Sequence, residues 1–130
     1  MRKLSLLVLF LLTFFTLSAQ DSIDVKKQLA EKMFQYALHN QGDSLYANMS
    51  DQVKSMVQPQ QFADIFQQLE TQVGKYKSHG SWEEQDIMGQ KCYVSTVSFE
   101  QSELGVLIVF DENNKMLGIQ FLPLEAIKKD

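Results

Sequence analysis

Two histidines and a pair of adjacent glutamates are the residues of this chain whose types suit acid–base or metal chemistry. His39 stands near the end of a predicted helix, where a cation interacts favourably with the helix dipole, so we interpret it as an exposed capping residue. His79 lies far along the chain in a polar strand or loop edge, and the two histidines lack the local spacing of a metal-binding pair. Glu83 and Glu84 are consecutive, which places them on opposite faces of a strand and prevents paired acid–base action.

Other signatures of catalysis do not occur in the sequence. It contains no Gly-x-Ser-x-Gly, no His-Glu-x-x-His and no phosphate-binding glycine loop. The run Asp111-Glu112-Asn113-Asn114 lacks the ligand spacing of a calcium loop and predicts a turn. Cys92 is the only cysteine, which excludes an internal disulfide, and its apolar-rich surroundings predict a buried thiol. We therefore expect no catalytic residues, no metal and no cofactor, and a protein that is not an enzyme.

The first 19 residues have the pattern of a cleavable secretory signal. Basic Arg2 and Lys3 precede an apolar stretch from Leu4 to Leu17, which ends at Ser18-Ala19-Gln20. This stretch is shorter than the roughly 20 apolar residues that span a bilayer, which disfavours the alternative of a membrane anchor. We expect cleavage after Ala19, or after Ser18, and export to a periplasm or to the outside of the cell, with no membrane attachment afterwards.

Length and charge restrict what the remaining chain can be. Removal of 19 residues from 130 leaves 111, and loss of Arg2 and Lys3 changes the formal net charge from −4 to −6. That length predicts a single domain over residues 20–130. An acidic chain without a cluster of basic residues repels phosphate, so we expect no nucleic-acid partner.

Apolar periodicity divides this domain into a helical first half and a strand-rich second half. Helices are predicted from Ser22 to about Asn40, from Ser44 to Met49, in a short turn after Ser50, and from Pro59 to Gly74. The first helix is expected to bury Leu29, Ala30, Met33, Phe34, Ala37 and Leu38. Four strands are predicted at Tyr76–Ile87, Cys92–Phe99, Leu104–Phe110 and Met116–Leu122. Short connections between them predict an antiparallel sheet, and the fold class is α+β with N-terminal helices packed on a curved four-stranded sheet.

The strand predicted at Leu104–Phe110 is apolar on both faces, so it should be central and covered on both sides. One face must meet the helices. The other face needs either a partner, such as a second subunit or a ligand, or internal cover from the curled sheet and the C-terminal tail. We expect Asp in place of Phe66 or Val109 to unfold the domain.

Three helical segments followed by a four-stranded antiparallel meander resemble the nuclear-transport-factor-like, cystatin-like α+β cone. Short runs of caps, turns and core residues carry a narrower resemblance; they are Gly42-Asp43-Ser44-Leu45-Tyr46, Met49-Ser50-Asp51-Gln52-Val53-Lys54, Gly74-Lys75-Tyr76, Val109-Phe110-Asp111, Lys115-Met116-Leu117-Gly118-Ile119 and Phe121-Leu122-Pro123. From about Val25 to Pro123 the chain is similar to a bacterial exported family, a domain of unknown function found alone or ahead of an α/β-hydrolase domain.

A cone of this kind implies an apolar cavity that holds a small molecule or a side chain of a partner. The residues expected to line it are Tyr46, Trp82, Tyr93, Val97 and Phe99. Our leading hypothesis is a non-catalytic binding or accessory domain for a small apolar ligand or an exported protein, and we expect a homodimer through the sheet face. The alternatives are a cofactor-free lyase or isomerase, which needs a buried carboxylate or histidine, and an interaction or inhibitor module that uses the sheet face.

Overall fold

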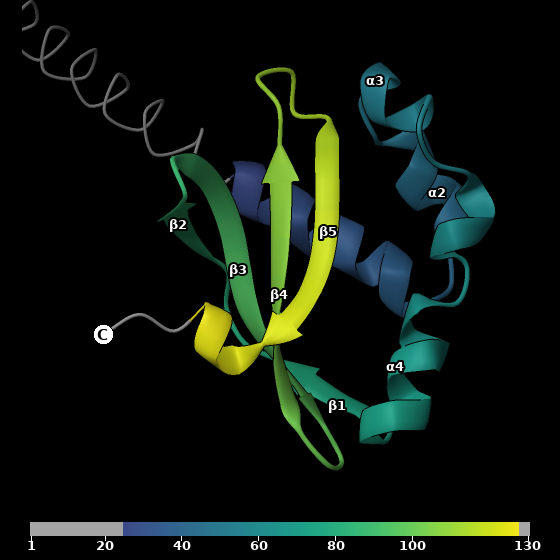
Figure 1. Cartoon of the computed structure of the whole chain (residues 1–130), viewed down its shortest axis with the longest axis vertical. Helices are drawn as coiled ribbons and strands as arrows, with labels where there is room; N and C mark the ends of the chain where they lie inside the picture. Colours follow the sequence, from purple (N-terminus) through teal and green to yellow (C-terminus); the bar gives the residue numbers. More distant parts are fainter. Residues whose placement is uncertain (1–24, 128–130) are drawn as a thin grey trace, which may run out of the picture.

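The computed structural model of the chain describes residues 25–127, so the predicted signal at 1–19 lies outside the described residues. Helices come first and five antiparallel strands follow, which confirms the α+β class and the packing of N-terminal helices on a curved sheet (Figure 1).

The N-terminal helix covers residues 25–38 and lies across one face of the sheet (Figure 1). Its buried side chains recur at steps of three and four, as predicted, and are Ala30, Met33, Phe34 and Ala37. Leu29 and Leu38, which were also predicted to be buried, are half-buried against the same cluster. The helix ends where Asn40 adopts a positive φ of 58° and the amide of Gln41 donates to the carbonyl of Tyr36.

Three short helices run beside the β5 edge of the sheet (Figure 1). Helix α2 spans Gly42–Ala47, α3 spans Asp51–Lys54 and α4 spans Ile65–Val73. Ser50 caps α3, as predicted, because its Oγ accepts from the amide of Val53. The single helix predicted from Pro59 is wrong: a 3-10 turn, η1, occupies Pro59–Phe62 and α4 starts after it. The break coincides with close backbone contact, since a Cβ on Gly42 would lie 3.0 Å from the backbone of Phe62 and Ala63.

The sheet contains β1 (Tyr76–His79), β2 (Glu83–Ile87), β3 (Gln90–Phe99), β4 (Glu103–Phe110) and β5 (Met116–Pro123). The path is β1-β3-β4-β5, and β2 pairs with the other half of β3. The prediction of one strand from Tyr76 to Ile87, and hence of four strands, is wrong. Residues 80–82 leave the strand path because Trp82 turns into the core, where it is 7% exposed.

Side chains of β4 alternate between two apolar clusters, one on each face of the sheet. Val106, Ile108 and Phe110 belong to the larger cluster beneath the N-terminal helix. Leu107 and Val109 belong to a smaller cluster on the opposite face, which we call the outer face; it also contains Ile87, Cys92, Val94, Leu122, Leu124 and Ile127. The C-terminal turn η2 (Leu124–Ala126) and Ile127 cover part of this face, since a Cβ on Gly105 would lie 2.6 Å from Ile127. The C-terminal segment of the chain therefore covers only part of the outer face.

The neighbours Ile108 and Val109 provide a matched test of these two faces. Ile108→Asp should prevent folding, because an unpaired buried carboxylate costs several kcal/mol against a total of about 5–15 kcal/mol. Val109 is only half-buried on the outer face, so the expectation from the sequence that a charge there unfolds the domain no longer applies. Val109→Lys should cost about 1 kcal/mol, since lysine can extend its ammonium to water. Circular dichroism and urea unfolding measure both; equal loss of structure in the two variants would contradict the assignment of the faces.

Candidate functional site

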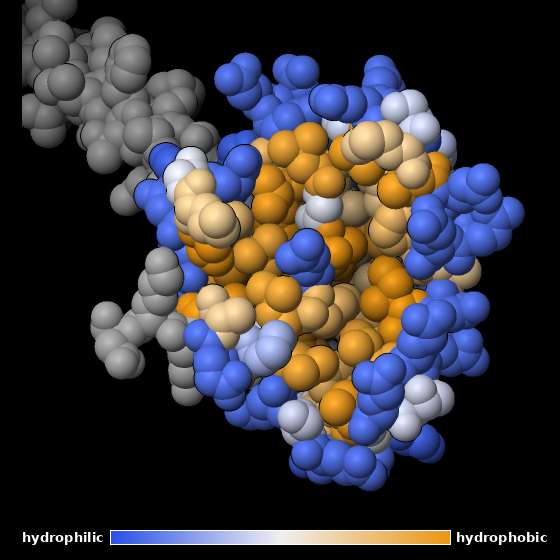
Figure 2. Space-filling model, viewed as in Figure 1, coloured by the Kyte–Doolittle hydropathy of each residue, from blue (hydrophilic) through white to orange (hydrophobic). Residues whose placement is uncertain are grey.

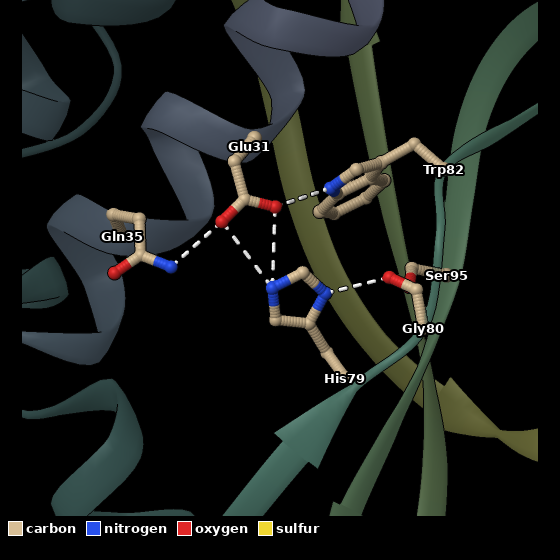
Figure 3. Close-up of polar contacts among 6 residues, drawn as sticks. All are labelled: Glu31, Gln35, His79, Gly80, Trp82 and Ser95. Carbon is tan, nitrogen blue, oxygen red and sulfur yellow. Dashed lines mark hydrogen bonds and ion pairs between the residues drawn. The ribbon is translucent and has the colours of Figure 1, made fainter.

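A network of polar side chains joins the N-terminal helix to the break between β1 and β2 (Figure 3). It starts from the Glu31 carboxylate on the helix and includes Gln35, His79, Gly80, Trp82 and Ser95; we call it the Glu31 network. Among the described residues it is the cluster in which a histidine and a carboxylate lie within ion-pair distance, so it is the first candidate for acid–base chemistry.

The Glu31 carboxylate has donors on both oxygens. Trp82 Nε1 donates to Oε1 at 2.9 Å, Gln35 Nε2 donates to Oε2 at 2.7 Å, and His79 Nε2 lies 3.2 Å from each oxygen. Partial burial raises the pKa of Glu31, but the hydrogen bonds from Trp82 and Gln35 and the proximity of His79 outweigh it, so the pKa lies below the ordinary 4.5. A carboxyl held ionised in this way is a poor general acid.

His79 has partners on both of its ring nitrogens. Nδ1 lies 2.7 Å from the carbonyl oxygen of Gly80, which also accepts from Ser95 Oγ at 2.9 Å, and Nε2 faces Glu31. A carbonyl and a carboxylate are both acceptors, and each accepts a hydrogen bond from the ring when the nitrogen that faces it carries the proton. Both ring nitrogens are therefore placed against groups of the protein itself. The contacts of His79 connect the N-terminal helix to the end of β1 and stabilise their packing.

Aromatic rings fill the space between the N-terminal helix and the sheet. Phe34 lies 4.6 Å from His79, 5.9 Å from Trp82 and 5.4 Å from Phe66, measured between ring centroids. Phe66 in turn contacts Tyr76, Phe99 and Phe121. Burial, with a smaller effect of Glu31, raises the pKa of Tyr76. Within the described residues, every buried side-chain nitrogen and oxygen has a hydrogen-bond partner, so the packed interior offers no unsatisfied polar group to a ligand.

The five residues predicted to line a cavity lie in or against this packed core. Trp82, Tyr93, Val97 and Phe99 are buried there, and half-buried Tyr46 packs against it while its hydroxyl donates to the carbonyl of Lys54 at 3.1 Å. The structure therefore brings four of the five residues together in one core, but packed side chains fill the space between them.

Tyr93 also borders a surface cleft of about 440 Å³ between the N-terminal helix and the β4–β5 turn. Its hydroxyl donates to Glu84 at 2.8 Å, and burial together with that carboxylate raises its pKa strongly. The tyrosine is therefore held protonated and already bonded. The cleft rim mixes both charges and consists of Lys26, Glu84, Lys91, Asp111 and Glu112.

Sequence reasoning missed Glu31, the centre of the network. The available signal was its position: it stands between buried Ala30 and Met33 on the predicted helix, where a charged residue at the border of an apolar stripe invites a search for a partner. His39 is exposed, as predicted, and its Nδ1 lies 2.9 Å from the carbonyl of Gln35.

The outer face of the sheet carries a different kind of feature, a shallow hollow of about 360 Å³. We call it the outer-face hollow; its lining residues are Ile87, Gln90, Cys92, Leu107, Val109, Leu117, Gly118 and Gln120. None of these eight side chains is charged. Figure 2 shows a broad apolar surface on this side of the molecule, edged by polar residues. Around Gly118 the hollow is open, since a Cβ there would meet nothing within 4 Å.

Cys92 forms part of the wall of the outer-face hollow. Its thiol is buried, as predicted, and lies 3.5 Å from the carbonyl of Gln90. Burial, with a smaller effect of Asp86, raises the pKa of this thiol, which suppresses the nucleophilic thiolate. Cys92 therefore acts as a small apolar residue of the wall.

Two other classes of site have no candidate among residues 25–127. No group of three or more His, Cys, Asp or Glu side chains in this range is placed to hold a metal ion. Among the same residues no helix has the length and apolarity needed to cross a membrane. The run at Asp111 forms the predicted turn, because Asp111 Oδ1 accepts from the amides of Asn113 and Lys115.

The lowered pKa of Glu31 predicts how the network contributes to stability. The ionised carboxylate stabilises the fold above about pH 4.5, and this contribution is lost as the pH falls through the lower pKa of the folded state. Glu31→Gln, which keeps an acceptor for Trp82, should therefore be less stable than wild type at pH 7 and approach it once the pH falls below the folded-state pKa of Glu31. Urea unfolding across this range measures the difference, with exposed Glu125→Gln as control. A gap for Glu31→Gln that stays constant with pH would refute the assignment.

Comparison with known proteins gives the family of the chain. The family described as "Protein of unknown function (DUF3887)" matches residues 30–119, a range that runs from the N-terminal helix into β5 and covers well over half of the sequence. Searches of curated proteins and of solved structures found no match. The expected membership of a family of unknown function is confirmed: this chain belongs to the DUF3887 family.

Proposed function

We propose that this protein is an exported, non-catalytic binding domain whose binding surface is the outer face of its sheet. The observation that carries the proposal is the outer-face hollow, an uncharged apolar depression over β4 that the C-terminal turn leaves open. Contiguous exposed apolar surface with a polar edge is typical of binding sites, because water contact with such a surface is unfavourable.

The interior of the fold supports this location of the site. Rings of Phe34, Phe66 and Phe99 occupy the space beneath the N-terminal helix, where an apolar ligand would otherwise bind. A ligand at the predicted residues Tyr46, Trp82, Tyr93, Val97 and Phe99 would have to displace this core. The outer-face hollow requires no such rearrangement.

The Glu31 network supports the non-catalytic part of the proposal. A lyase or isomerase needs a base with a free lone pair or an acid with a raised pKa, near space for a substrate. His79 uses both ring nitrogens within the protein, and Glu31 has a lowered pKa. These observations favour binding over the alternative of a cofactor-free enzyme.

Two further parts of the proposal, export and the cone fold, each have support of their own. The basic start, apolar stretch and Ser18-Ala19-Gln20 boundary favour export. The order of helices and strands, with the N-terminal helix across the curved sheet, favours a nuclear-transport-factor-like cone. The occupant of the outer face would be a small apolar ligand or a protein partner.

Comparison of variants by native mass spectrometry tests the proposal. Wild type, Val109→Lys and Met56→Lys are purified from their own exported fractions; Met56 is 71% exposed just after α3 and provides a matched control for an added lysine. We expect wild type and Met56→Lys to retain added mass, as ligand or protein, and Val109→Lys to lose at least about nine-tenths of it, because a charge at the hollow opposes apolar contact. If Val109→Lys retains the same added mass as wild type, the proposal is refuted.

A further inference from the structure

We infer that the outer-face hollow receives the Met88 side chain of a second copy of this chain, so that two copies form a symmetric dimer. The inference rests on the proposed function and names the partner of the same surface. It starts from two complementary features that lie next to each other on one molecule, a projecting apolar side chain and an open apolar depression.

Met88 is the projecting feature. It lies with Gly89 in the two-residue turn between β2 and β3, where both residues have positive φ, 53° for Met88 and 80° for Gly89. Asn, Asp or Gly usually occupy such turn positions. Here a large apolar residue takes one of them and is 99% exposed, so residues 25–127 give its side chain essentially no cover.

The hollow is the complementary feature. The hollow is open at Gly118, which is paired with Val109 on the neighbouring strand, and a side chain at Gly118 would occupy that space. Its volume of about 360 Å³ is ample for a methionine side chain, whose flexible, unbranched shape adapts to irregular apolar surfaces.

The uncharged lining of the hollow allows a second copy to be the source of the methionine. Without Arg2 and Lys3 the mature chain carries a formal net charge of −6, so two copies repel each other over most orientations. The lining of the hollow has no charged residue, and its polar members Gln90 and Gln120 carry amides, which donate and accept at once. A two-fold interface must suit two identical surfaces, and amides beside an apolar centre meet that condition whereas a single sign of charge does not.

The position of Met88 beside the hollow favours a closed dimer. Ile87 and Gln90, which flank the turn, both line the hollow, so the projecting residue stands at the rim of its own depression. Around a two-fold axis near this rim, each Met88 can enter the hollow of the other copy at the same time. This isologous arrangement closes after two copies and leaves neither feature uncovered.

Two substitutions test the projecting methionine and the hollow separately, and neither is expected to destabilise the fold. Met88→Asn removes the apolar side chain and places in the turn a residue that tolerates positive φ. Gly118→Leu fills the hollow, and it meets open space at a residue whose φ is not positive. Met56→Asn is the matched control for loss of an exposed methionine elsewhere.

Sedimentation velocity over a concentration series tests the dimer with the mature protein. We expect wild type and Met56→Asn to dimerise, and Met88→Asn and Gly118→Leu each to weaken the dimer about tenfold or more, with an unchanged circular dichroism spectrum. Mixing the two variants should restore one contact, because Met88 of the Gly118→Leu copy fits the hollow of the Met88→Asn copy. The mixed dimer should then be tighter than either variant alone.

Three results would overturn the inference: a wild type that stays monomeric, a dimer that persists unweakened in both variants, or a mixture no tighter than its components. If wild type is monomeric while Val109→Lys still loses a retained ligand or partner, the second copy is refuted and the proposed binding face stands. If Val109→Lys also retains the wild-type masses, both the dimer and the proposed function fail.

Discussion

Strand β4 imposes the constraint on which the rest of the structure depends, because its side chains are apolar on both faces of the sheet. Val106, Ile108 and Phe110 are covered by the N-terminal helix and the aromatic core. Leu107 and Val109 face the other way, where η2 and Ile127 supply only part of the cover. Burial of apolar area is the main favourable contribution to folding and association, so the uncovered part of this face is where a partner gains most.

The helix-facing side is specialised for stability, and this explains why it is a poor site. The Glu31 carboxylate connects the N-terminal helix to Trp82 and His79, and it holds the sheet in the broken path that forms β1 and β2. Because the rings fill the interior and the polar groups there have partners, ligand binding inside would first have to break this packing. In the proposed function, stability and binding therefore belong to opposite faces of one sheet.

Local patterns predicted the parts of the fold that local forces determine. Helical spacing identified Ala30, Met33, Phe34 and Ala37, and the two-sided apolar pattern identified β4 as the central strand that needs cover. The break after His79 was missed because its cause is distant: Trp82 turns inward to a carboxylate 51 positions earlier in the chain. The Glu31 network and the outer-face hollow were missed for the same reason, since the hollow depends on the register that sets Gly118 opposite Val109.

Solvent accessibility of the outer face shows whether a binding partner covers this face in solution. In the mature protein at dimer-forming concentration, methyl NMR with a soluble paramagnetic agent compares Leu107, Val109 and Leu117 with the exposed methyl of Met56. If a partner covers the face, the methyls of the outer face and of Met88 are protected from the paramagnetic agent, while the methyl of Met56 relaxes fast. Relaxation of Val109, Leu117 and Met88 at the rate that their exposure in a single chain allows would contradict this cover by a partner.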